Sequence, residues 1–295
     1  MAEPLFRRLA LIGIGLIGSS IARVNRERGG LAAEIVATAR TEKTRTRVAE
    51  LGIVDRVEAD PVAAVAGADC VILCTPVGTF RALAEQIGPH LSQGAILSDV
   101  GSTKQSVIRD VTPHIPQGVH FVPGHPLAGT EYSGPDAGFA SLFDGRFTLL
   151  TPLPETDPAA VERMAEFWRR CGSMVEVMDA GHHDRVLAIV SHLPHLIAFT
   201  ICGTADDLAD ESRQQVLKYA ASGFRDFTRI AASDPEMWRD VFLNNREALL
   251  EMLARFMEDA QTMARAVRWG DAAYIEDKIQ RGRRIRKSLI ELKQA

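Results

Sequence analysis

Residues 9–20, with the sequence LALIGIGLIGSS, run from an apolar strand-like segment through three glycines into the start of a helix. In a turn of this kind the first glycine makes the tight bend, and the second lets a pyrophosphate approach the backbone. The third lets the helix pack closely on the strand, with phosphate at the helix N-terminus. Because the glycines follow a strand and open a helix, the stretch predicts a dinucleotide-binding loop rather than merely a tight turn. The expected cofactor contacts in this loop are Gly13, Gly15, Leu16, Ile17 and Gly18.

Short apolar runs alternate with amphipathic segments from this loop to about residue 178. Runs such as EIVATAR, CVILCTP and AILSDVG are rich in Val, Ile and Leu, which is typical of parallel strands covered on both faces. We expect HFVPGH, FTLLTP and MVEVMD to be further strands of the same sheet. The alternation predicts an α/β, Rossmann-type, doubly wound and mostly parallel sheet in residues 1–178. Residues 179–295 carry no strand signal and predict a second, all-helical domain.

The start of one helix in the second half can be predicted from its sequence. In SDPEMWRDVF, Asp234 is placed to cap the free N–H groups and Pro235 stands at the first helical position. Beyond it, apolar residues recur at steps of four and three and form one continuous stripe, which favours either a bundle core or a subunit seam. We therefore expect a homodimer. The stripe consists of Leu249, Leu253, Phe256, Ala260, Met263 and Val267.

The composition of the chain limits the kinds of binding partner that can be expected. An apolar content of 46% and a charged content of 24% are ordinary for a globular protein, and the net charge of −4 offers no general attraction for nucleic acid or membranes. The arginine-rich run in residues 280–295 is expected to be a solvated or subunit-facing helix. Cys70 and Cys74 lie inside an apolar run and are interpreted as core thiols. With no apolar leader at the N-terminus, we expect a cytoplasmic protein.

The choice of cofactor is read at the end of the second strand. A carboxylate there would bind the ribose 2′-hydroxyl of NAD, but the sequence has Arg40 and Thr41, with Lys43 close behind. Arg40 can form a charge-assisted fork with a 2′-phosphate, which favours NADP over NAD, although a solvated strand-end arginine is the alternative. Thr75 and Pro76, after the CVILC strand, are expected to line the cofactor.

A histidine stands in the stretch FVPGHPLAGTE, residues 121–131. Between Gly124 and Pro126, His125 is expected on a rigid, solvated turn, where a polar turn residue is the plain alternative to a functional one. Ligands of open α/β sheets bind beyond the carboxyl ends of the strands, and the loop DVGSTK with Ser102 leaves a neighbouring strand end. We therefore expect Ser102 and His125 to face the group that reacts with the nicotinamide.

The helical half supplies further candidates. In SHLPH, His192 and His195 can share one helical face, and we expect His195 to face a ligand and His192 to have a core or capping role. A metal site is not expected, since His182 and His183 match only by residue type.

An arginine follows in the stretch SGFRDFTRIAASDP. Arg229 suits a substrate carboxylate, or else it pairs with Asp226 on the surface.

Five stretches in order, GIGLIGSS, DVGSTK, GHPLAGTE, SHLPHLIAF and SGFRDFTRIAASDPEMWRD, resemble the prephenate/arogenate (cyclohexadienyl) dehydrogenases of tyrosine biosynthesis over nearly the whole chain. The resemblance implies a Rossmann domain with a helical dimerisation domain, and oxidative decarboxylation of prephenate to 4-hydroxyphenylpyruvate, of arogenate to tyrosine, or of both. It implies His125 as the catalytic histidine, assisted by Ser102. The implied substrate-pocket residues are His195, Arg229, Glu131, Asp226 and Trp238.

The chemistry explains these residue types. A base must take the hydroxyl proton as hydride leaves the ring carbon, and a neutral imidazole does this near pH 7. Loss of the ring carboxylate then restores aromaticity, so no covalent nucleophile is needed and Ser102 has an orienting role. We expect no additional regulatory module, so that any tyrosine inhibition would act at the substrate site. The alternatives are a β-hydroxyacid dehydrogenase, whose catalytic lysine has no matching motif here, and a redox-sensing NADP-binding dimer.

Overall fold

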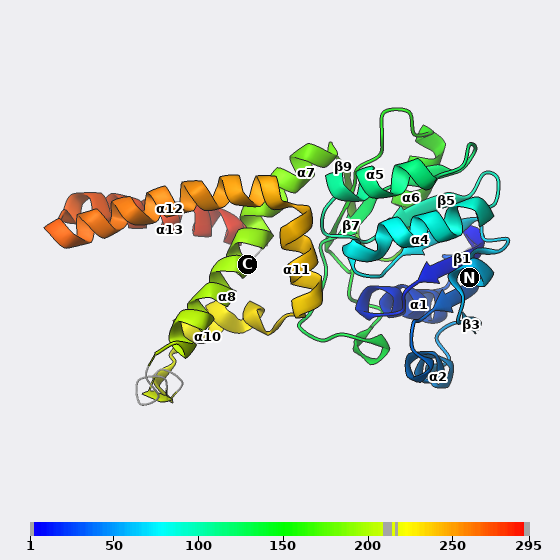
Figure 1. The fold of residues 1–295 in the computed structure, drawn as a ribbon, viewed down its shortest axis with the longest axis horizontal. Coiled ribbons are helices and arrows are strands. Elements are labelled where there is room, and N and C mark those ends of the chain that lie inside the picture. The colour runs from blue at the N-terminus through cyan, green and yellow to red at the C-terminus, as the bar shows by residue number, and fades with distance from the viewer. Residues whose placement is uncertain (1–2, 209–213, 216–217, 292–295) are drawn as a thin grey trace. The chain divides into compact units, whose positions relative to one another are not determined.

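The structure, a computed structural model, describes residues 3–208, 214–215 and 218–291. The chain divides into two compact units, Met1–Arg246 and Glu247–Ala295 (Figure 1). The first unit holds all the described strands and the helices up to α11, so every candidate site residue lies within it.

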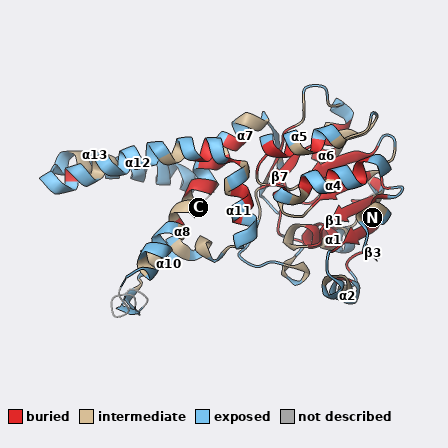
Figure 2. Cartoon of the chain, viewed as in Figure 1, coloured by how far each residue is buried: buried red, intermediate tan, exposed pale blue. Residues whose placement is uncertain are grey.

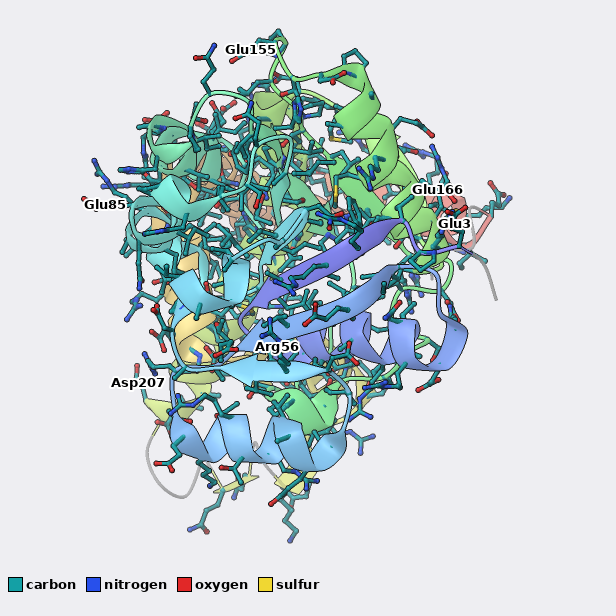
Figure 3. All side chains as sticks on the ribbon, turned by 90° about the vertical axis from the view of Figure 1, so that its right-hand side faces the viewer. Glu3, Arg56, Glu85, Glu155, Glu166 and Asp207 are labelled. Carbon is teal, nitrogen blue, oxygen red and sulfur yellow. The ribbon has the colours of Figure 1, made fainter. Side chains whose placement is uncertain are left out.

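A six-stranded parallel sheet forms the centre of the first unit, with strand order β3-β2-β1-β4-β5-β6. Its strands are β1 (Phe6–Ile12), β2 (Ala32–Thr38), β3 (Arg56–Glu58), β4 (Cys70–Leu73), β5 (Ile96–Asp99) and β6 (His120–Val122). The expected doubly wound Rossmann-type sheet is therefore confirmed. Its edge strand β3 is short and charged, which protects an open sheet edge, and Arg56 there pairs with Glu34 of β2 at 3.0 Å (Figure 3).

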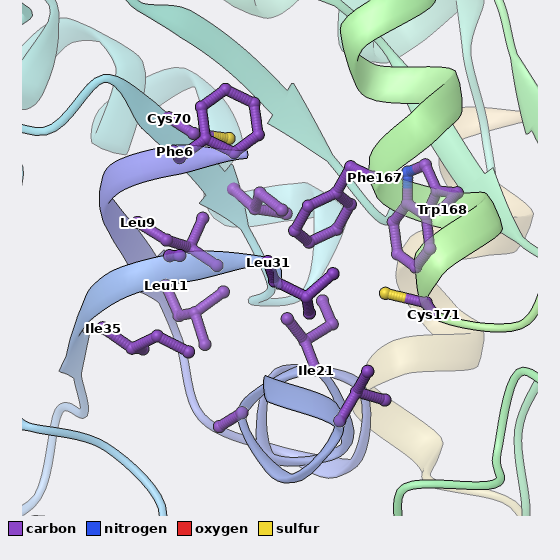
Figure 4. Packing of buried hydrophobic residues seen from close by; sticks show 14 of the residues in the cluster. Phe6, Leu9, Leu11, Ile21, Leu31, Ile35, Cys70, Phe167, Trp168 and Cys171 are labelled. Carbon is purple, nitrogen blue, oxygen red and sulfur yellow. The ribbon is translucent and has the colours of Figure 1, made fainter. Parts of the chain in front are cut away.

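Successive side chains of β1 point to opposite faces of the sheet, and both faces are buried. Leu9 and Leu11 join one apolar cluster, whereas Ala10 and Ile12 join the other. The first cluster is shown in Figure 4, and Figure 2 shows that burial follows the sheet and the inner faces of its helices. The covering helices are α1 (Leu16–Arg28), α2 (Glu42–Leu51), α3 (Pro61–Val65), α4 (Phe80–Ile87), α5 (Gln105–Val111) and α6 (Pro158–Arg170).

The aromatic end of the first cluster comes from α6. Phe167 and Trp168 are fully buried and their rings meet edge to face with centroids 5.4 Å apart. Burying a side chain of the size of Phe167 stabilises the fold by about 1.5–3 kcal/mol. Cys70 lies in the same cluster as a free thiol, and burial raises its pKa, which agrees with the expected core role.

The last three strands form a separate sheet, which corrects the expectation of one continuous sheet. Pro123 separates β6 from β7 (Gly124–Pro126), which runs antiparallel to β8 (Phe147–Leu150), and β9 (Met174–Val177) completes the order β7-β8-β9. His125 pairs with Leu149 in this sheet and keeps only 7% of its surface exposed. The prediction of an exposed turn at His125 is therefore wrong, because strand pairing to β8 places the histidine inside the protein.

Helices α7 (Ala180–Leu187), α8 (Leu193–Asp206), α10 (Ser222–Thr228) and α11 (Pro235–Asn244) complete the first unit. A π-helical turn, Ala188–His192, joins α7 to α8. Pro194 lacks an N–H and its ring crowds the carbonyl four residues earlier, so a wider turn at this point relieves the clash. At the start of α11, Asp234 accepts a hydrogen bond from the backbone N–H of Met237 at 2.8 Å, which confirms the predicted cap.

The run Ala180–Asp206 is the one stretch of the described chain that could span a bilayer by its length and hydropathy alone. Its polar residues argue for packing within protein, because His183 and Asp184 near its start are buried and hydrogen-bonded to other residues of the first unit. An apolar helix of a folded protein core passes the same test of length and hydropathy.

The second unit consists mainly of the long helices α12 (Arg246–Trp269) and α13 (Ala272–Glu291), joined through Gly270 at φ +70°. Lys278 of α13 pairs with Asp259 of α12 at 2.8 Å. The predicted stripe lies on α12, and Phe256 and Val267 keep 41% and 64% of their surfaces exposed. The arginine-rich run forms the exposed end of α13 as far as Glu291, and residues 292–295 lie outside the described residues.

Candidate active site

The three glycines of the loop after β1 differ in how much space surrounds them. Gly13 adopts φ +102°, and a Cβ there would lie 2.9 Å from the backbone of Cys74. A Cβ on Gly18 would lie 2.5 Å from the carbonyl oxygen of Gly13, so the helix could not approach the strand. Gly15, by contrast, faces open space and forms the N-terminus of α1 without a side-chain cap. The half-buried Leu16 and Ile17 follow it, so uncapped N–H groups and free space meet where a pyrophosphate would bind.

The end of β2 presents cations. Arg40 is exposed, and its guanidinium makes no hydrogen bond or ion pair with any residue that the structure describes. Its carbonyl accepts a hydrogen bond from Arg45 at 3.0 Å, which fixes the backbone at this point. Thr41 caps α2 by accepting from the N–H of Thr44 at 3.2 Å, so its side chain has a local structural task. The residues present therefore suit a nicotinamide nucleotide, with a free guanidinium beside the β2 end.

The loop after β4 is closely braced. The hydroxyl groups of Thr75 and Thr79 lie 2.7 Å apart, and Pro76 accepts a hydrogen bond from Thr79. Gly78 in this loop donates its backbone N–H to Asp240 of α11 at 3.2 Å. Helix α11 is thereby tied directly to the loop expected to line the cofactor.

His125 is surrounded by other ionisable groups. Its Nδ1 lies 2.9 Å from Nε2 of His183, whose Nδ1 lies 2.8 Å from Oδ1 of Asp184. Burial lowers the pKa of His125 well below its usual range, and the Lys104 charge, as well as any positive charge on His183, acts in the same direction. The ring is therefore neutral at pH 7 because burial disfavours its charged form, and not only because an ordinary imidazole has a pKa below 7.

A buried ion pair fixes the residue before this histidine. Lys104 and Asp99 are both fully buried and contact each other through Nζ and Oδ2. Lys104 Nζ also donates to the carbonyl of Gly124 at 2.7 Å, and Asp99 Oδ1 accepts from the Gly124 N–H at 3.2 Å. Gly124 is thus held at both of its backbone polar groups, which sets the position of His125.

Ser102 lies in the same loop as Lys104 and is half-buried. Its hydroxyl makes no hydrogen bond within the described part of the chain, so the structure does not show a contact between Ser102 and His125. Gly101 beside it packs against Val77, where a Cβ would come within 2.6 Å of Cγ1. The three loops expected to converge, after β4, after β5 and at His125, are therefore in contact.

His192 and His195 differ in burial and in partners. His192 is fully buried and its Nδ1 accepts from the side-chain amide of Asn245 at 3.0 Å, while burial lowers its pKa to about 4. His195 is half-buried and its ring stacks on Trp238 with centroids 3.6 Å apart. Its Nδ1 donates to the carbonyl of Ser191 at 2.9 Å, so the neutral ring has its lone pair on Nε2.

Arg229 and Glu131 come from distant parts of the chain and lie 3.9 Å apart. The Arg229 side chain is 66% exposed and that of Glu131 35%. The surface alternative, in which Arg229 pairs with Asp226, is not what the described residues form, although Asp226 is exposed on the preceding helix. A cation and a carboxylate that meet weakly in this way leave the guanidinium available to a ligand.

Sequence reasoning missed His183, Asp184, Lys104 and Asp99 as parts of the site. Asp99 and Lys104 both stand within the quoted DVGSTK motif, and a lysine five residues after an aspartate at the end of an apolar run is a usable signal. Nothing in the sequence around His183 indicates that it meets a residue 58 positions away. Among the described residues, no cluster of three or more His, Cys, Asp or Glu side chains is arranged to hold a metal ion.

The glycine loop, the parallel sheet and the buried neutral imidazole define a Rossmann-type dehydrogenase with a helical second half. The nucleotide-binding domain of prephenate dehydrogenase matches residues 21–177, and the prephenate dehydrogenase dimerization domain matches residues 179–281. The chain belongs to the prephenate dehydrogenase family, as its motifs predicted.

Individual relatives agree with this. The cyclohexadienyl dehydrogenase of Zymomonas mobilis is 38% identical over 96% of both chains. The structure of prephenate dehydrogenase from A. aeolicus, in complex with hydroxyphenyl propionate and NAD+, is 32% identical, covers 96% of this chain and 98% of its own, and superimposes with a TM-score of 0.86. The Synechocystis arogenate dehydrogenase structure is 26% identical over 95% and 99%, with a TM-score of 0.79. These relatives do not favour the β-hydroxyacid dehydrogenase alternative.

Proposed function

We propose that this protein oxidatively decarboxylates prephenate to 4-hydroxyphenylpyruvate, arogenate to tyrosine, or both, with a nicotinamide nucleotide as oxidant. The observation that carries the proposal is the buried, neutral His125, whose ring is hydrogen-bonded to His183. The glycine loop and Arg229 belong to the same compact unit as this histidine. The named activities of its relatives supply the substrate class.

His125 acts as the general base. A nicotinamide nucleotide held at the glycine loop would supply the hydride acceptor for the carbinol carbon of the substrate ring. Nε2 of His125 takes the hydroxyl proton, so the oxygen can form a carbonyl as the hydride departs. Ser102, whose hydroxyl makes no hydrogen bond among the described residues, orients the substrate hydroxyl. Loss of the ring carboxylate as carbon dioxide then restores aromaticity, and no protein nucleophile is required.

The helical residues recognise the side chain of the substrate. Arg229 binds its carboxylate through a charge-assisted contact, displacing the weak pairing with Glu131. His195 presents a lone pair on Nε2 and therefore accepts a hydrogen bond from the ligand, with Trp238 stacked behind it. Asp226 and Glu131 shape the charge around this position. Any inhibition by tyrosine acts here, because tyrosine carries a carboxylate on the side chain of its ring and a ring hydroxyl in the same relative positions as the substrates.

The cofactor is NADP in preference to NAD. The guanidinium of Arg40, which has no partner among the described residues, can pair with a 2′-phosphate. The residues between β2 and α2 include no carboxylate, and the nearest one along the chain is Glu42 at the start of α2. The expected cofactor contacts remain the glycine loop, Arg40, Thr41, Thr75 and Pro76. NAD in the A. aeolicus complex shows that a relative binds the unphosphorylated form, so the comparison of both cofactors belongs in the assay.

By the family matches, the chain consists of a nucleotide-binding domain, residues 1–178, and a helical dimerisation domain, residues 179–295, and forms a homodimer, whereas its two compact units divide after Arg246. The family matches meet between residues 177 and 179. Exposed apolar residues on α8 and α12, such as Ile201, Phe256 and Val267, suit a subunit interface. We place the protein in the cytoplasm, where these biosynthetic substrates are soluble metabolites.

A steady-state assay of both cyclohexadienols with both cofactors tests the proposal. We expect nicotinamide reduction with at least one of the two substrates and a lower KM for NADP than for NAD. Reduction with 3-hydroxyisobutyrate in place of either cyclohexadienol would support the β-hydroxyacid alternative. Binding of NADP without turnover of any of these compounds would support the redox-sensing dimer.

A further inference from the structure

Three side chains in the first unit form a continuous buried chain of hydrogen bonds. Asp184 and His183 lie on α7, and His125 lies on β7, 58 positions earlier in the sequence. The rings of the two histidines meet edge to face with centroids 5.1 Å apart. All three side chains keep 7% or less of their surface exposed, so water does not compete for these contacts.

The carboxylate end of this chain fixes the direction of its hydrogen bonds. Oδ1 of Asp184 accepts the backbone N–H of Lys104 at 2.8 Å, and Oδ2 accepts that of Gln105 at 2.9 Å. Despite burial, which alone would raise it, the pKa of Asp184 is lowered by the hydrogen bonds from His183 and these two backbone groups. An ionised carboxylate only accepts, so Nδ1 of His183 carries a proton and donates to it.

The tautomers of both histidines follow. Burial lowers the pKa of His183, so its ring is neutral and its Nε2 is a lone pair. That lone pair can accept only from a protonated Nδ1 of His125. A neutral His125 protonated on Nδ1 has its own lone pair on Nε2, the atom that must receive the substrate proton.

We propose that His183, backed by Asp184, is the positioning residue of the site, which holds His125 with its proton on Nδ1 and stabilises the imidazolium formed during turnover. The proposal rests on the function of His125 proposed above. In the step itself the substrate O–H bond breaks, its proton bonds to Nε2 of His125, and its electron pair forms the carbonyl as hydride passes to the oxidised nicotinamide. His183 forms and breaks no covalent bond.

Other charges near the two rings make this support necessary. The Lys104 ammonium disfavours a second positive charge on His125 and on His183, and positive charge on His183 or on His192 would also lower the pKa of His125. Asp99 and Asp184 are the carboxylates that act on His183 in the opposite direction. Asp184 therefore supplies, through His183, a negative partner for the cation that forms on His125.

The tautomers can be read directly by 15N NMR of histidine-labelled wild-type protein. We expect the signals of His125 and His183, assigned by single substitution, to show protonated Nδ1 and unprotonated Nε2 at pH 7.5. A protonated Nε2 on His125 would overturn the proposal without any measurement of activity. This readout also decides the matter if a substituted protein fails to fold.

Kinetics of His183→Leu, His183→Gln and the matched control His182→Leu complete the test. His182 is the exposed neighbour of His183. We expect His183→Leu to lower kcat by about 10–10³-fold, with the acid limb of the kcat profile moved to lower pH and substrate KM nearly unchanged. Glutamine, which retains an acceptor for His125, should restore part of the loss, and His182→Leu should behave as wild type.

The two proposals fail in different ways. If His125→Asn is inactive while His183→Leu keeps the wild-type kcat and acid limb, the positioning role is wrong and the general base stands. If His125→Asn keeps the wild-type kcat, the proposed function of His125 is wrong and the positioning role falls with it.

Discussion

The residue proposed as base and the residue proposed to bind the substrate are held in opposite ways. His125 has only 7% of its surface exposed and lies in a strand, hydrogen-bonded to a second histidine. The glycine before it is hydrogen-bonded to a buried ion pair. The Arg229 side chain is 66% exposed, and its ion-pair partner among the described residues, Glu131, lies 3.9 Å away. Proton transfer demands a fixed lone pair, whereas a guanidinium that must meet a ligand gains nothing from a strong partner in the free protein.

This contrast predicts where substitutions act. On the buried side, changes should affect kcat, stability and the response to pH. On the exposed side, they should affect KM and leave the fold intact.

The largest effect is expected from His125→Asn. Asparagine can place an N–H near the former Nδ1 and keep the bond to His183, but it has no atom in the position of Nε2. We expect kcat to fall by ~10²–10⁴-fold with little change in cofactor affinity, measured by steady-state kinetics and nucleotide titration. An unchanged kcat would show that His125 is not the general base.

Next in size is Lys104→Met, measured by denaturant unfolding. The substitution leaves Asp99 buried without its cation, which costs about 3–5 kcal/mol, and frees the carbonyl of Gly124. The matched control is Lys278→Met, since Lys278 also pairs with an aspartate, Asp259, but at the surface. An exposed pair of this kind contributes about 0–1 kcal/mol. Equal losses in the two variants would contradict the distinction between buried and exposed pairs.

A smaller effect on the buried side depends on pH. Burial lowers the pKa of His192 to about 4 from 6.5, so between these values the unfolded chain binds more protons than the folded protein. This contribution to stability is fully present above pH 6.5 and is lost as the pH falls toward 4, by about 3 kcal/mol at most. Unfolding free energies of wild type and His192→Gln between pH 4.5 and 8 should therefore converge at the acid end. Parallel curves would show that His192 does not titrate in this way, and His182→Gln is the control.

The sequence predicted what depends on neighbours along the chain. The glycine loop, the parallel strands and the cap at Asp234 each follow from a few adjacent residues, and the structure has the predicted strands and cap. The motifs that revealed the family also named His125 and Arg229.

What the sequence could not predict depends on tertiary packing. The pairing of β7 with β8 turned an expected surface turn into a buried strand, and no local pattern around Pro123 announces that break. The contact between His125 and His183 joins a strand to a helix across 58 residues, and the Asp99–Lys104 pair is recognisable only once both are seen to be buried. The sequence therefore identified the proposed base, His125, but not the residues that hold it in position.

The smallest effect is expected on the exposed side, from Arg229→Ala. Since the pairing of Arg229 with Glu131 is weak and lies at the surface, its loss should leave the unfolding free energy nearly unchanged. A lost charge-assisted contact to the substrate carboxylate corresponds to ~1.5–3 kcal/mol, which appears chiefly as a KM raised by about 10–150-fold. Arg225→Ala, an exposed arginine on the preceding helix, is the control and should match wild type. A fall in kcat with KM unchanged would mean that Arg229 acts on the transition state, so that the division between a rigid base and an accessible cation does not describe this site.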